Sequence, residues 1–110
     1  MYRVFYIAVP ETKLTYVAAL ILRAIHAGLA HGFDIMDTAG LASGTVYPAL
    51  RRLEKAGLVR SKWEGPRTAA AAQRPARKYY ELTRSGAQIL KEAEARYRLP
   101  EFESKEEVSR

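Results

Sequence analysis

Basic side chains are concentrated in one stretch of the chain. Between Ser43 and Arg84 there are ten lysine and arginine residues and three acidic residues, whereas the remainder of the chain has eight basic and nine acidic residues. The formal net charge of the whole chain is +6, so this stretch holds all of the excess positive charge. Clustered cations attract a polyanion, although charge alone does not distinguish a nucleic acid from a membrane surface. We therefore expect an anionic partner to bind along this stretch.

A helix is predicted at the start of the basic stretch, with Ser43 as its N-cap and Gly57 just after its end. Its apolar stripe, which has the helical period, consists of Val46, Ala49, Leu50, Leu53 and Ala56. The stripe leaves polar, aromatic and cationic side chains on the outward face, namely Thr45, Tyr47, Pro48, Arg51, Arg52 and Lys55. Glu54 is expected at the flank, so the outward face has no carboxylate.

This outward face suits the major groove of duplex DNA. The groove admits one helix, and its base edges and phosphates offer hydrogen-bond acceptors. Arg51 or Arg52 can donate two hydrogen bonds to a guanine edge.

The first turn of the same helix suits a phosphate. Free backbone N–H groups and the positive end of the helix dipole lie at Ser43, Gly44 and Thr45, and Gly44 allows a close approach of the DNA backbone. Pro48 lacks an N–H group and crowds the preceding turn. We therefore expect an irregular opening between Gly44 and Tyr47.

A two-stranded hairpin is predicted after this helix. From Leu58 to Trp63 the apolar period changes to two, and Arg77 to Thr83 is a tyrosine-rich second strand. Between them, Gly65 to Ala76 has no amphipathic pattern and is expected to be a mobile loop. The strand aromatics are expected to pack internally, Trp63 over the core and Tyr79 with Tyr80 across the strands. The hairpin adds five cations to the expected DNA-binding surface: Lys62, Arg67, Arg74, Arg77 and Lys78.

Two helices are predicted before the basic stretch. The first extends from Leu14 to Ile25, with Thr12 as its N-cap and Gly28 as its stop. The second extends from Phe33 to Ala39, with its apolar residues three apart, and ends at Gly40. The short connection from the second helix to the next one suggests a helix-turn-helix.

A last helix is predicted from a Thr83 cap to about Arg98, with Pro100 as its stop. The predicted fold class is therefore mainly α with a small β-hairpin, a winged helix-turn-helix, plus a C-terminal helix. A chain of 110 residues allows one core. Its expected parts are an N-terminal arm (1–11), the winged domain (12–83), the C-terminal helix (84–99) and a flexible tail (100–110).

The sequence offers little for catalysis. There is no cysteine, which excludes disulfides, thiolate metal sites and cysteine nucleophiles. One enzyme hypothesis stays open, because His31, Asp34 and Asp37 can align on the second helix and hold a divalent ion. Acids at a helix start more often complement its dipole, so we expect no enzyme activity, no cofactor and no metal. The richest apolar stretch is interrupted by Arg23 and His26 and is too short to cross a bilayer, and a cytoplasmic location without membrane binding is expected.

Three stretches of the chain resemble the PadR family of transcription regulators. They are Leu29-Ala30-His31-Gly32-Phe33-Asp34-Ile35, the run from Ser43 to Val59, and Arg77 to Thr83 with Gly86. The most specific part is Gly-Thr-Val-Tyr-Pro-Ala-Leu in the second stretch, whereas the Leu-Thr-x-x-Gly ending is shared by several winged-helix families. The resemblance covers about residues 14–90.

The resemblance implies a winged helix followed by a dimerising C-terminal helix, usually acting as a repressor at a pseudo-palindromic operator. It implies that Ser43, Thr45, Tyr47, Pro48 and Arg51 meet the major groove, and that the basic residues of the hairpin touch the backbone or the minor groove. Many members release DNA when a small, often aromatic, compound binds, but these effectors vary so much that we carry none over. The dimer interface is expected to use Leu14, Val17, Ile21, Ile89, Leu90, Ala93 and Tyr97.

The chain departs from the family pattern in three places. The second helix and the turn before Ser43 are short, and a single helix follows the hairpin, as in the shorter-tailed members. The apolar arm from Met1 to Pro10 is not part of the motif, and it is expected either to pack across the dimer or to close the core of the monomer. Two hypotheses of function stay open: a homodimeric regulator that binds duplex DNA, and a winged helix that docks a protein partner without DNA.

Overall fold

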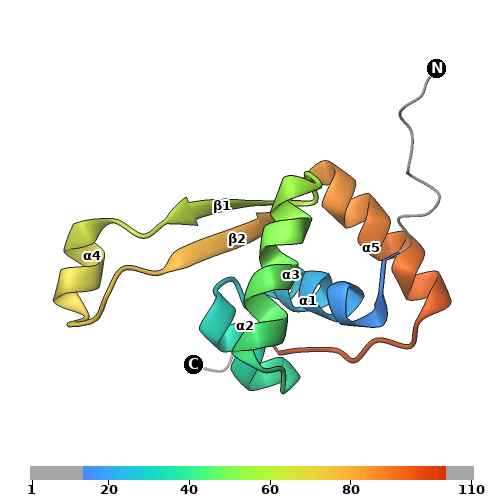
Figure 1. Cartoon of the computed structure of the whole chain (residues 1–110), viewed down its shortest axis with the longest axis horizontal. Coiled ribbons are helices and arrows are strands. Elements are labelled where there is room, and N and C mark those ends of the chain that lie inside the picture. Colours follow the sequence, from blue (N-terminus) through green and yellow to red (C-terminus); the bar gives the residue numbers. More distant parts are fainter. Residues whose placement is uncertain (1–13, 104–110) are drawn as a thin grey trace.

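The computed structural model describes residues 14–103, so the predicted N-terminal arm and the tail from residue 104 onwards lie outside the described residues. In chain order the elements are α1 (Tyr16–His26), α2 (Gly32–Ala39), α3 (Ser43–Lys55), β1 (Val59–Trp63), α4 (Pro66–Ala71), β2 (Lys78–Leu82) and α5 (Arg84–Arg96). Helices α1, α2, α3 and α5 form one body, and the hairpin of β1 and β2 projects from it with α4 at its far end (Figure 1). The predicted fold class is confirmed. Within the described residues, no helix is long and apolar enough to cross a membrane.

The core is built around α1, which contacts α2, α3, α5 and β2. Ile21 and Leu22 of α1 are fully buried and share one apolar cluster with Ile35 of α2 and Leu50 of α3. Burial of one such side chain stabilises the folded state by about 1.5–3 kcal/mol. These contacts therefore hold α2 and α3 in a fixed orientation against α1.

The N-cap of α1 differs from the prediction. The helix begins after Thr15, whose Oγ1 accepts a hydrogen bond from the backbone N–H of Ala18 at 3.1 Å. The predicted cap, Thr12, lies outside the described residues. The cap in the structure is Thr15, three residues later in the chain.

The apolar face of α2 also differs from the prediction. Ile35 is fully buried, whereas Phe33 is exposed over 62% of its surface. Residues two positions apart lie on nearly opposite sides of a helix, so α2 can direct only one of the two toward the core. The predicted end of α2 is confirmed, because Gly40 follows it with a φ of +71°.

Helix α3 is continuous through Pro48, which corrects the expected irregular opening. Ser43 is the first helical residue and not the cap, since the cap position is Ala42, whose carbonyl accepts the N–H of Val46 at 3.0 Å. Pro48 removes only the bond that its own N–H would give to the carbonyl of Gly44. Gly44 is exposed, so water can satisfy that carbonyl. The buried stripe is as predicted at Val46, Ala49, Leu50 and Leu53, whereas Ala56 is exposed.

The register of the hairpin divides its side chains between two faces. Val59 pairs with Leu82 and Trp63 pairs with Lys78. Because side chains alternate along a strand, one face carries Ser61, Trp63, Lys78 and Tyr80, and the other carries Arg60, Lys62, Tyr79 and Glu81. Val59 is buried, but Trp63 is exposed over 64% of its surface. The expectation that Trp63 covers the core is wrong, because four strand residues at about 3.3 Å each carry it beyond the core.

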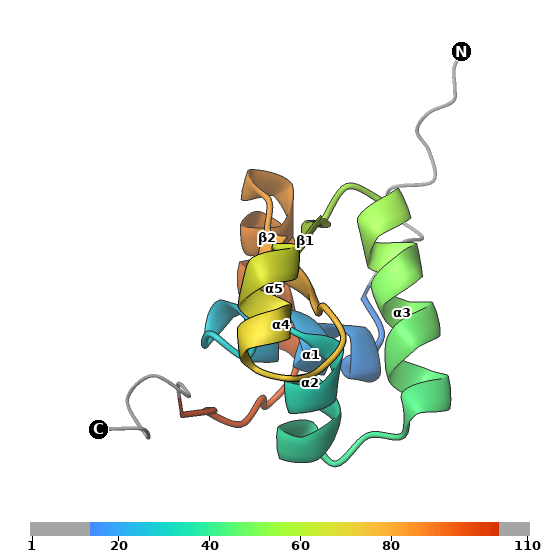
Figure 2. The same cartoon turned by 90° about the vertical axis from the view of Figure 1, so that its left-hand side faces the viewer.

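The segment expected to be a mobile loop, residues 65–76, contains the helix α4, which lies at the end of the hairpin (Figure 2). Pro66 occupies the first turn, where a backbone N–H makes no hydrogen bond within the helix, so the N–H that proline lacks is not needed. The alanines that follow have the highest helix propensity. Glu64 and Arg74, on either side of α4, are joined by hydrogen bonds of 2.6 and 2.9 Å. These hydrogen bonds hold the two ends of α4 together, and α4 is too short to be stable alone.

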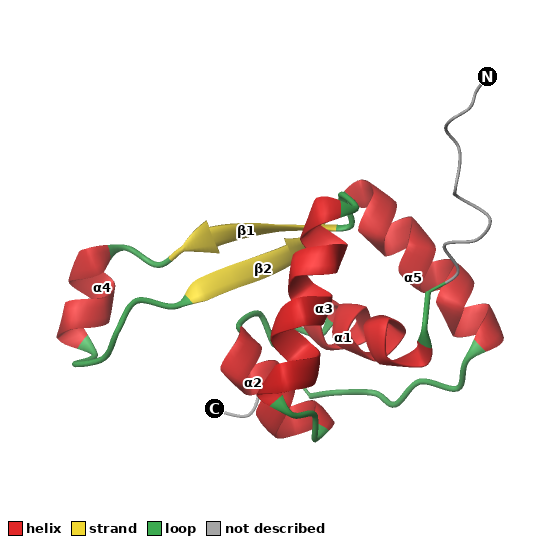
Figure 3. Cartoon of the chain, in the orientation of Figure 1, coloured by secondary structure: helices red, strands yellow, loops and turns green. Residues whose placement is uncertain are grey.

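Helix α5 is attached to the turn after α3 through Thr83. Its Oγ1 accepts the N–H of Gly86 at 3.0 Å and donates to the carbonyl of Gly57 at 2.6 Å, and its own N–H donates to the carbonyl of Leu58 at 3.1 Å. Thr83 is thus the cap that the sequence predicts, and the helix ends at Arg96 rather than at about Arg98. The chain then returns beneath α1 (Figure 3), where Leu99 and Phe102 pack against the core.

Candidate nucleic-acid interface

The structure exposes the outward face that the sequence predicts for α3. Tyr47 is exposed over 40% of its surface and Pro48 is partly buried. The remaining members of the face are exposed: Thr45, Arg51, Arg52 and Lys55. Ser43 and Gly44 are also exposed, and apart from its chain neighbours and the backbone of its own helix turn, no atom lies within 4 Å of the position that a Cβ would take at Gly44. The backbone at the start of α3 is therefore open to a close approach.

A hollow of about 400 Å³ lies between α3 and the hairpin. Tyr47 and Arg51 line it from α3, and Trp63 and Lys78 line it from the hairpin. The other lining residues are His31, Gly32, Phe33, Ala76, Arg77 and Tyr80. We call it the helix–hairpin hollow. Helix and hairpin therefore meet around one concave surface, and the side chains predicted to read DNA face it from both elements.

A second hollow, of about 610 Å³, continues this surface along α3. Arg51 and Lys78 line both hollows. The other residues that line the second hollow are Pro48, Arg52, Glu54 and Lys55. The structure thus brings together seven of the predicted DNA-binding residues, which are Tyr47, Pro48, Arg51, Arg52, Lys55, Arg77 and Lys78.

The carboxylate of Glu54 links α3 to both strands of the hairpin. Its Oε2 accepts a hydrogen bond from Oγ of Ser61 at 2.6 Å, and its Oε1 lies 3.8 Å from Nζ of Lys78. The Lys78 ammonium also lies over the rings of Trp63 and Tyr80, 5.7 and 5.9 Å from their centroids. Glu54 is therefore engaged within the protein and orients Lys78 at the junction of the two hollows.

The position of Tyr47 depends on a glycine in the preceding helix. A Cβ at Gly32 would lie 2.5 Å from Cε1 of Tyr47 and 2.7 Å from its hydroxyl oxygen. The tyrosine ring therefore lies directly against the first residue of α2, where any side chain would displace it. In this way α2 fixes the direction in which α3 presents its aromatic side chain.

Arg74 is paired inside the hairpin tip. Both of its terminal nitrogens donate to the carboxylate of Glu64, which also accepts the N–H of Arg77 at 3.2 Å and the hydroxyl of Tyr79 at 3.3 Å. These donors, with Arg74 first among them, lower the pKa of Glu64 to about 2. Arg74 therefore orders the tip, whereas Arg67 on α4 is exposed.

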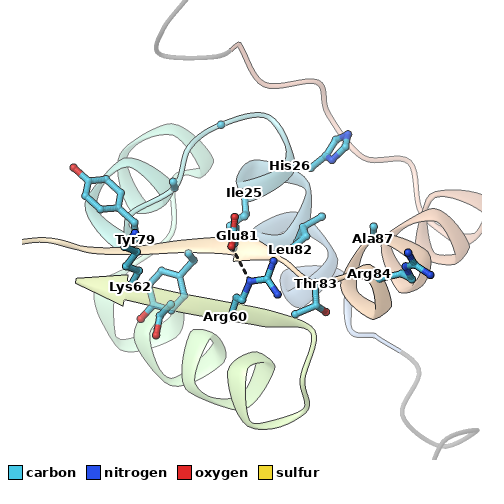
Figure 4. A pocket seen from close by; sticks show the side chains of 14 residues that line it. Ile25, His26, Arg60, Lys62, Tyr79, Glu81, Leu82, Thr83, Arg84 and Ala87 are labelled. Carbon is cyan, nitrogen blue, oxygen red and sulfur yellow. Dashed lines mark hydrogen bonds and ion pairs between the residues drawn. The ribbon is translucent and has the colours of Figure 1, made fainter. Parts of the chain in front are cut away.

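Lys62 lies on the face of the hairpin that carries Tyr79 and Glu81, away from the side chains that face α3. It lines a separate open hollow of about 920 Å³ with Arg84 and Ile25 (Figure 4). In the same hollow, Nε of Arg60 donates to Glu81 at 2.7 Å. The structure therefore does not bring Lys62 together with the cations of α3.

Two of the three residues weighed as metal ligands, His31 and Asp34, form a helix cap, and Asp37 is exposed. Nδ1 of His31 accepts the N–H of Asp34 at 3.4 Å, and its Nε2 lies 3.0 Å from Oδ2 of the same residue. Burial lowers the pKa of His31 despite the opposing charge of Asp34, and its ring packs edge to face with Tyr79. In the part of the chain that the structure describes, no three His, Cys, Asp or Glu side chains are grouped as a metal site.

Four of the seven residues predicted for the dimer interface belong to the core of the single chain. They are Leu14, Ile21, Leu90 and Ala93. These side chains expose at most 7% of their surface in the single chain, and their part in a dimer interface stays a prediction. Val17, Ile89 and Tyr97 are only partly buried. Tyr97 packs edge to face with Tyr16, which is exposed over 44% of its surface.

Phe33 and Trp63 also belong to this surface, although neither was predicted to bind DNA. A signal for each is present in the sequence. Phe33 is two residues from Ile35, so only one of them can face the core. Trp63 closes a strand whose first residue, Val59, already reaches the core.

The tight connection between α2 and α3, followed by the hairpin, defines a winged helix-turn-helix, in which α3 has the place of the recognition helix and the hairpin is the wing. The transcriptional regulator PadR-like family matches residues 21–92. The chain belongs to this family, and it is a transcription regulator rather than an enzyme.

Solved structures give the same result. The chain is similar to a PadR-like transcription factor from Bacteroides fragilis, with 33% identity over 74% of this chain and 80% of that one and a TM-score of 0.61. A PadR family regulator from Clostridium difficile R20291 gives 27% identity over 76% and 88%, with a TM-score of 0.66. One from Eggerthella lenta DSM 2243 gives 30% identity over 80% and 77%, with a TM-score of 0.60. The comparison with curated proteins gives no match.

Proposed function

We propose that this regulator binds a specific duplex DNA sequence as a homodimer and acts as a repressor in the cytoplasm, with α3 in the major groove and the wing on the adjacent backbone. The observation that carries the proposal is the shared concave surface, on which Tyr47 and Arg51 of α3 face Lys78 of the wing. Membership of the family supports DNA binding. A small-molecule effector that releases the DNA would follow the usual behaviour of the family.

Each part of the surface suits one feature of DNA. Arg51 and Arg52 are exposed on α3, and arginine donates two hydrogen bonds to the edge of a guanine. Lys55 and Lys78 border the same surface and suit phosphates on either side of the groove. The exposed first turn of α3 offers backbone N–H groups to a further phosphate, with Gly44 leaving room for its approach.

The homodimer would place two copies of α3 in successive major grooves, about 34–36 Å apart, on a pseudo-palindromic operator. The described residues that keep surface for this contact are Tyr16, Val17, Ile89 and Tyr97. They lie on α1, in the middle of α5 and at its C-cap, so pairing there would leave α3 and the wing uncovered.

Fluorescence anisotropy with duplex DNA from upstream of the protein's own gene tests the proposal. Affinity should fall with salt, by about 0.9 logarithmic units per phosphate contact for each tenfold rise in salt. Tyr47→Ala and Arg51→Ala should weaken operator binding by about 1–3 kcal/mol and weaken binding to random DNA less. Arg60→Ala is the matched control, because it removes the same charge as Arg51→Ala on the opposite face of the hairpin.

Three outcomes would count against the proposal. Equal losses on operator and random DNA would show that Tyr47 and Arg51 only anchor the backbone. Equal losses for Arg60→Ala and Arg51→Ala would show that total charge, and not this surface, governs binding. A folded dimer that binds no duplex DNA at low salt would favour docking of an acidic protein instead.

A further inference from the structure

We propose that Phe33 and Trp63 form two apolar walls that contact thymine methyl groups in the operator. The inference rests on the proposed function and deepens it, because it adds apolar base recognition to a surface argued so far from its cations. Neither residue belongs to the third helix, whose outward face the sequence predicts to read DNA. They come from α2 and from the outer end of β1.

The first observation is the exposure of large apolar side chains. Among the described residues, the large hydrophobic side chains that are exposed are Tyr16, Phe33, Tyr47 and Trp63. Three of these four line the helix–hairpin hollow, and the two most exposed, Phe33 and Trp63, do so from different elements. Apolar surface gathered in one concavity marks a site of interaction. Tyr16, by contrast, packs against Tyr97 elsewhere on the chain.

The second observation is the charge around the aromatic side chains. Arg51, Arg77 and Lys78 line the same hollow, and the Lys78 ammonium lies 5.7 Å from the centre of the Trp63 ring. An occupant must therefore be anionic overall and present apolar groups among its charges. Duplex DNA meets both conditions, because the thymine methyl is the apolar group on the base edges of its major groove.

The third observation is continuity with the proposed reading surface. Arg51 lines both this hollow and the neighbouring one along α3. A base pair next to the one that Arg51 contacts would therefore lie toward Phe33 and Trp63. An acidic peptide also combines charge with apolar groups, but it has no reason to follow the cations along α3.

The test removes single methyl groups from the DNA. With the operator selected by the full chain, each thymine is replaced in turn by deoxyuridine, which lacks only the 5-methyl group. At one or two positions of each half-site the unmodified protein should lose about four-fold in affinity, the effect of transferring one methyl-sized group out of water. In Phe33→Ala or Trp63→Ala the same replacement of thymine should cause no further loss of affinity. Phe33→Leu keeps an apolar wall and should retain part of the sensitivity.

Trp63 supplies an independent readout, because it is the only tryptophan in the chain. Operator binding should protect its fluorescence from acrylamide quenching, and an acidic peptide of equal charge should not. Both side chains are exposed, so the alanine variants should keep the melting temperature of the unmodified protein.

The outcomes separate this inference from the proposed function. Operator binding could depend on Arg51 while each deoxyuridine lowers the affinity of Phe33→Ala and Trp63→Ala as much as that of the unmodified protein. In that case the proposed methyl contacts of Phe33 and Trp63 are wrong and the DNA-binding proposal stands. Unchanged quenching of Trp63 on operator binding would overturn its part in the same way. If no duplex is bound while an acidic peptide protects Trp63, both proposals fail.

Discussion

Two glycine-to-alanine substitutions at helix starts should differ in their effect on stability: one should destabilise the fold and the other should not. Gly86 is the third residue of α5, and a Cβ there would lie 1.9 Å from the carbonyl oxygen of Leu58. Real Cβ contacts are essentially never closer than 3.0 Å. Gly86→Ala therefore forces α5 and the turn at Leu58 apart by about an ångström, since both groups belong to the backbone and neither can rotate away.

The size of the effect follows from the contacts that this movement breaks. Thr83 makes two hydrogen bonds to the turn, one to Gly57 and one to Leu58, and each contributes about 0.5–1.5 kcal/mol. Overpacking adds about 1–3 kcal/mol, and the better helix propensity of alanine offsets up to about 1 kcal/mol. The net loss is about 1–6 kcal/mol, and its upper values are comparable with the 5–15 kcal/mol typical of a domain.

Gly44→Ala is the control, because Gly44 is also in the first turn of a helix but has no atom near its missing Cβ. It should leave the free energy of unfolding unchanged or raise it by up to about 1 kcal/mol. Urea titration followed by circular dichroism measures both variants. If Gly86→Ala is as stable as Gly44→Ala, the close docking of α5 on Leu58 is wrong. Gly44→Ala should still weaken operator binding, because its methyl group obstructs the phosphate that the proposal places there.

Three further predictions use single substitutions. Gly32→Ala should displace the Tyr47 ring and weaken operator binding by about 1–3 kcal/mol with little change in melting temperature; unchanged binding would show that the ring position does not matter. Glu64→Gln should raise amide hydrogen exchange in α4 at neutral pH. The folded pKa of Glu64 is about 2 against an ordinary 4.5, so the stabilising effect of its carboxylate is complete above about pH 4.5. The difference in hydrogen exchange between variant and unmodified protein should therefore shrink as the pH falls toward 2. A difference that does not depend on pH would contradict this. His31 has a folded pKa below its ordinary 6.5, so urea stability should fall as the pH is lowered below 6.5, and His31→Asn, which keeps a capping oxygen for Asp34, should remove that fall.

The elements that local pattern can specify were predictable from the sequence. The stripe of α3 has four buried residues at the helical period, and it gives the outward face directly. Thr83 is a polar cap before a helix and Gly40 is a stop after one, and both act as predicted. Caps and apolar stripes are determined by residues within one or two helical turns of each other. The spacing of residue types along the sequence is therefore enough to predict them.

Two of the errors come from contacts or packing that lie beyond the local pattern, and a third comes from the exposure of a helix start. Helix α4 has no amphipathic pattern, and it is held by the pairing of Glu64 with Arg74, ten residues apart. Trp63 lies on the same face of β1 as the buried Val59, so the strand pattern predicts that it is buried. The helices that form the core do not extend as far as the end of β1. The strand pattern carries no information on their extent. Pro48 was expected to disturb α3, yet the carbonyl that it leaves unbonded lies at exposed Gly44, where water can satisfy it.

The acidic residues of the basic stretch determine where its excess charge is available. Each of the three is paired with a cation of the hairpin segment: Glu54 with Lys78, Glu64 with Arg74, and Glu81 with Arg60. Within residues 14–103, the three cations of α3, which are Arg51, Arg52 and Lys55, take part in no ion pair. The pairs therefore order the wing and engage three of its cations, while the three cations of α3 stay outside the ion pairs. Since salt dependence follows the number of phosphates neutralised, and the hairpin segment keeps Lys62, Arg67 and Arg77 outside these pairs, α3 and the wing should both contribute to the salt sensitivity of DNA binding.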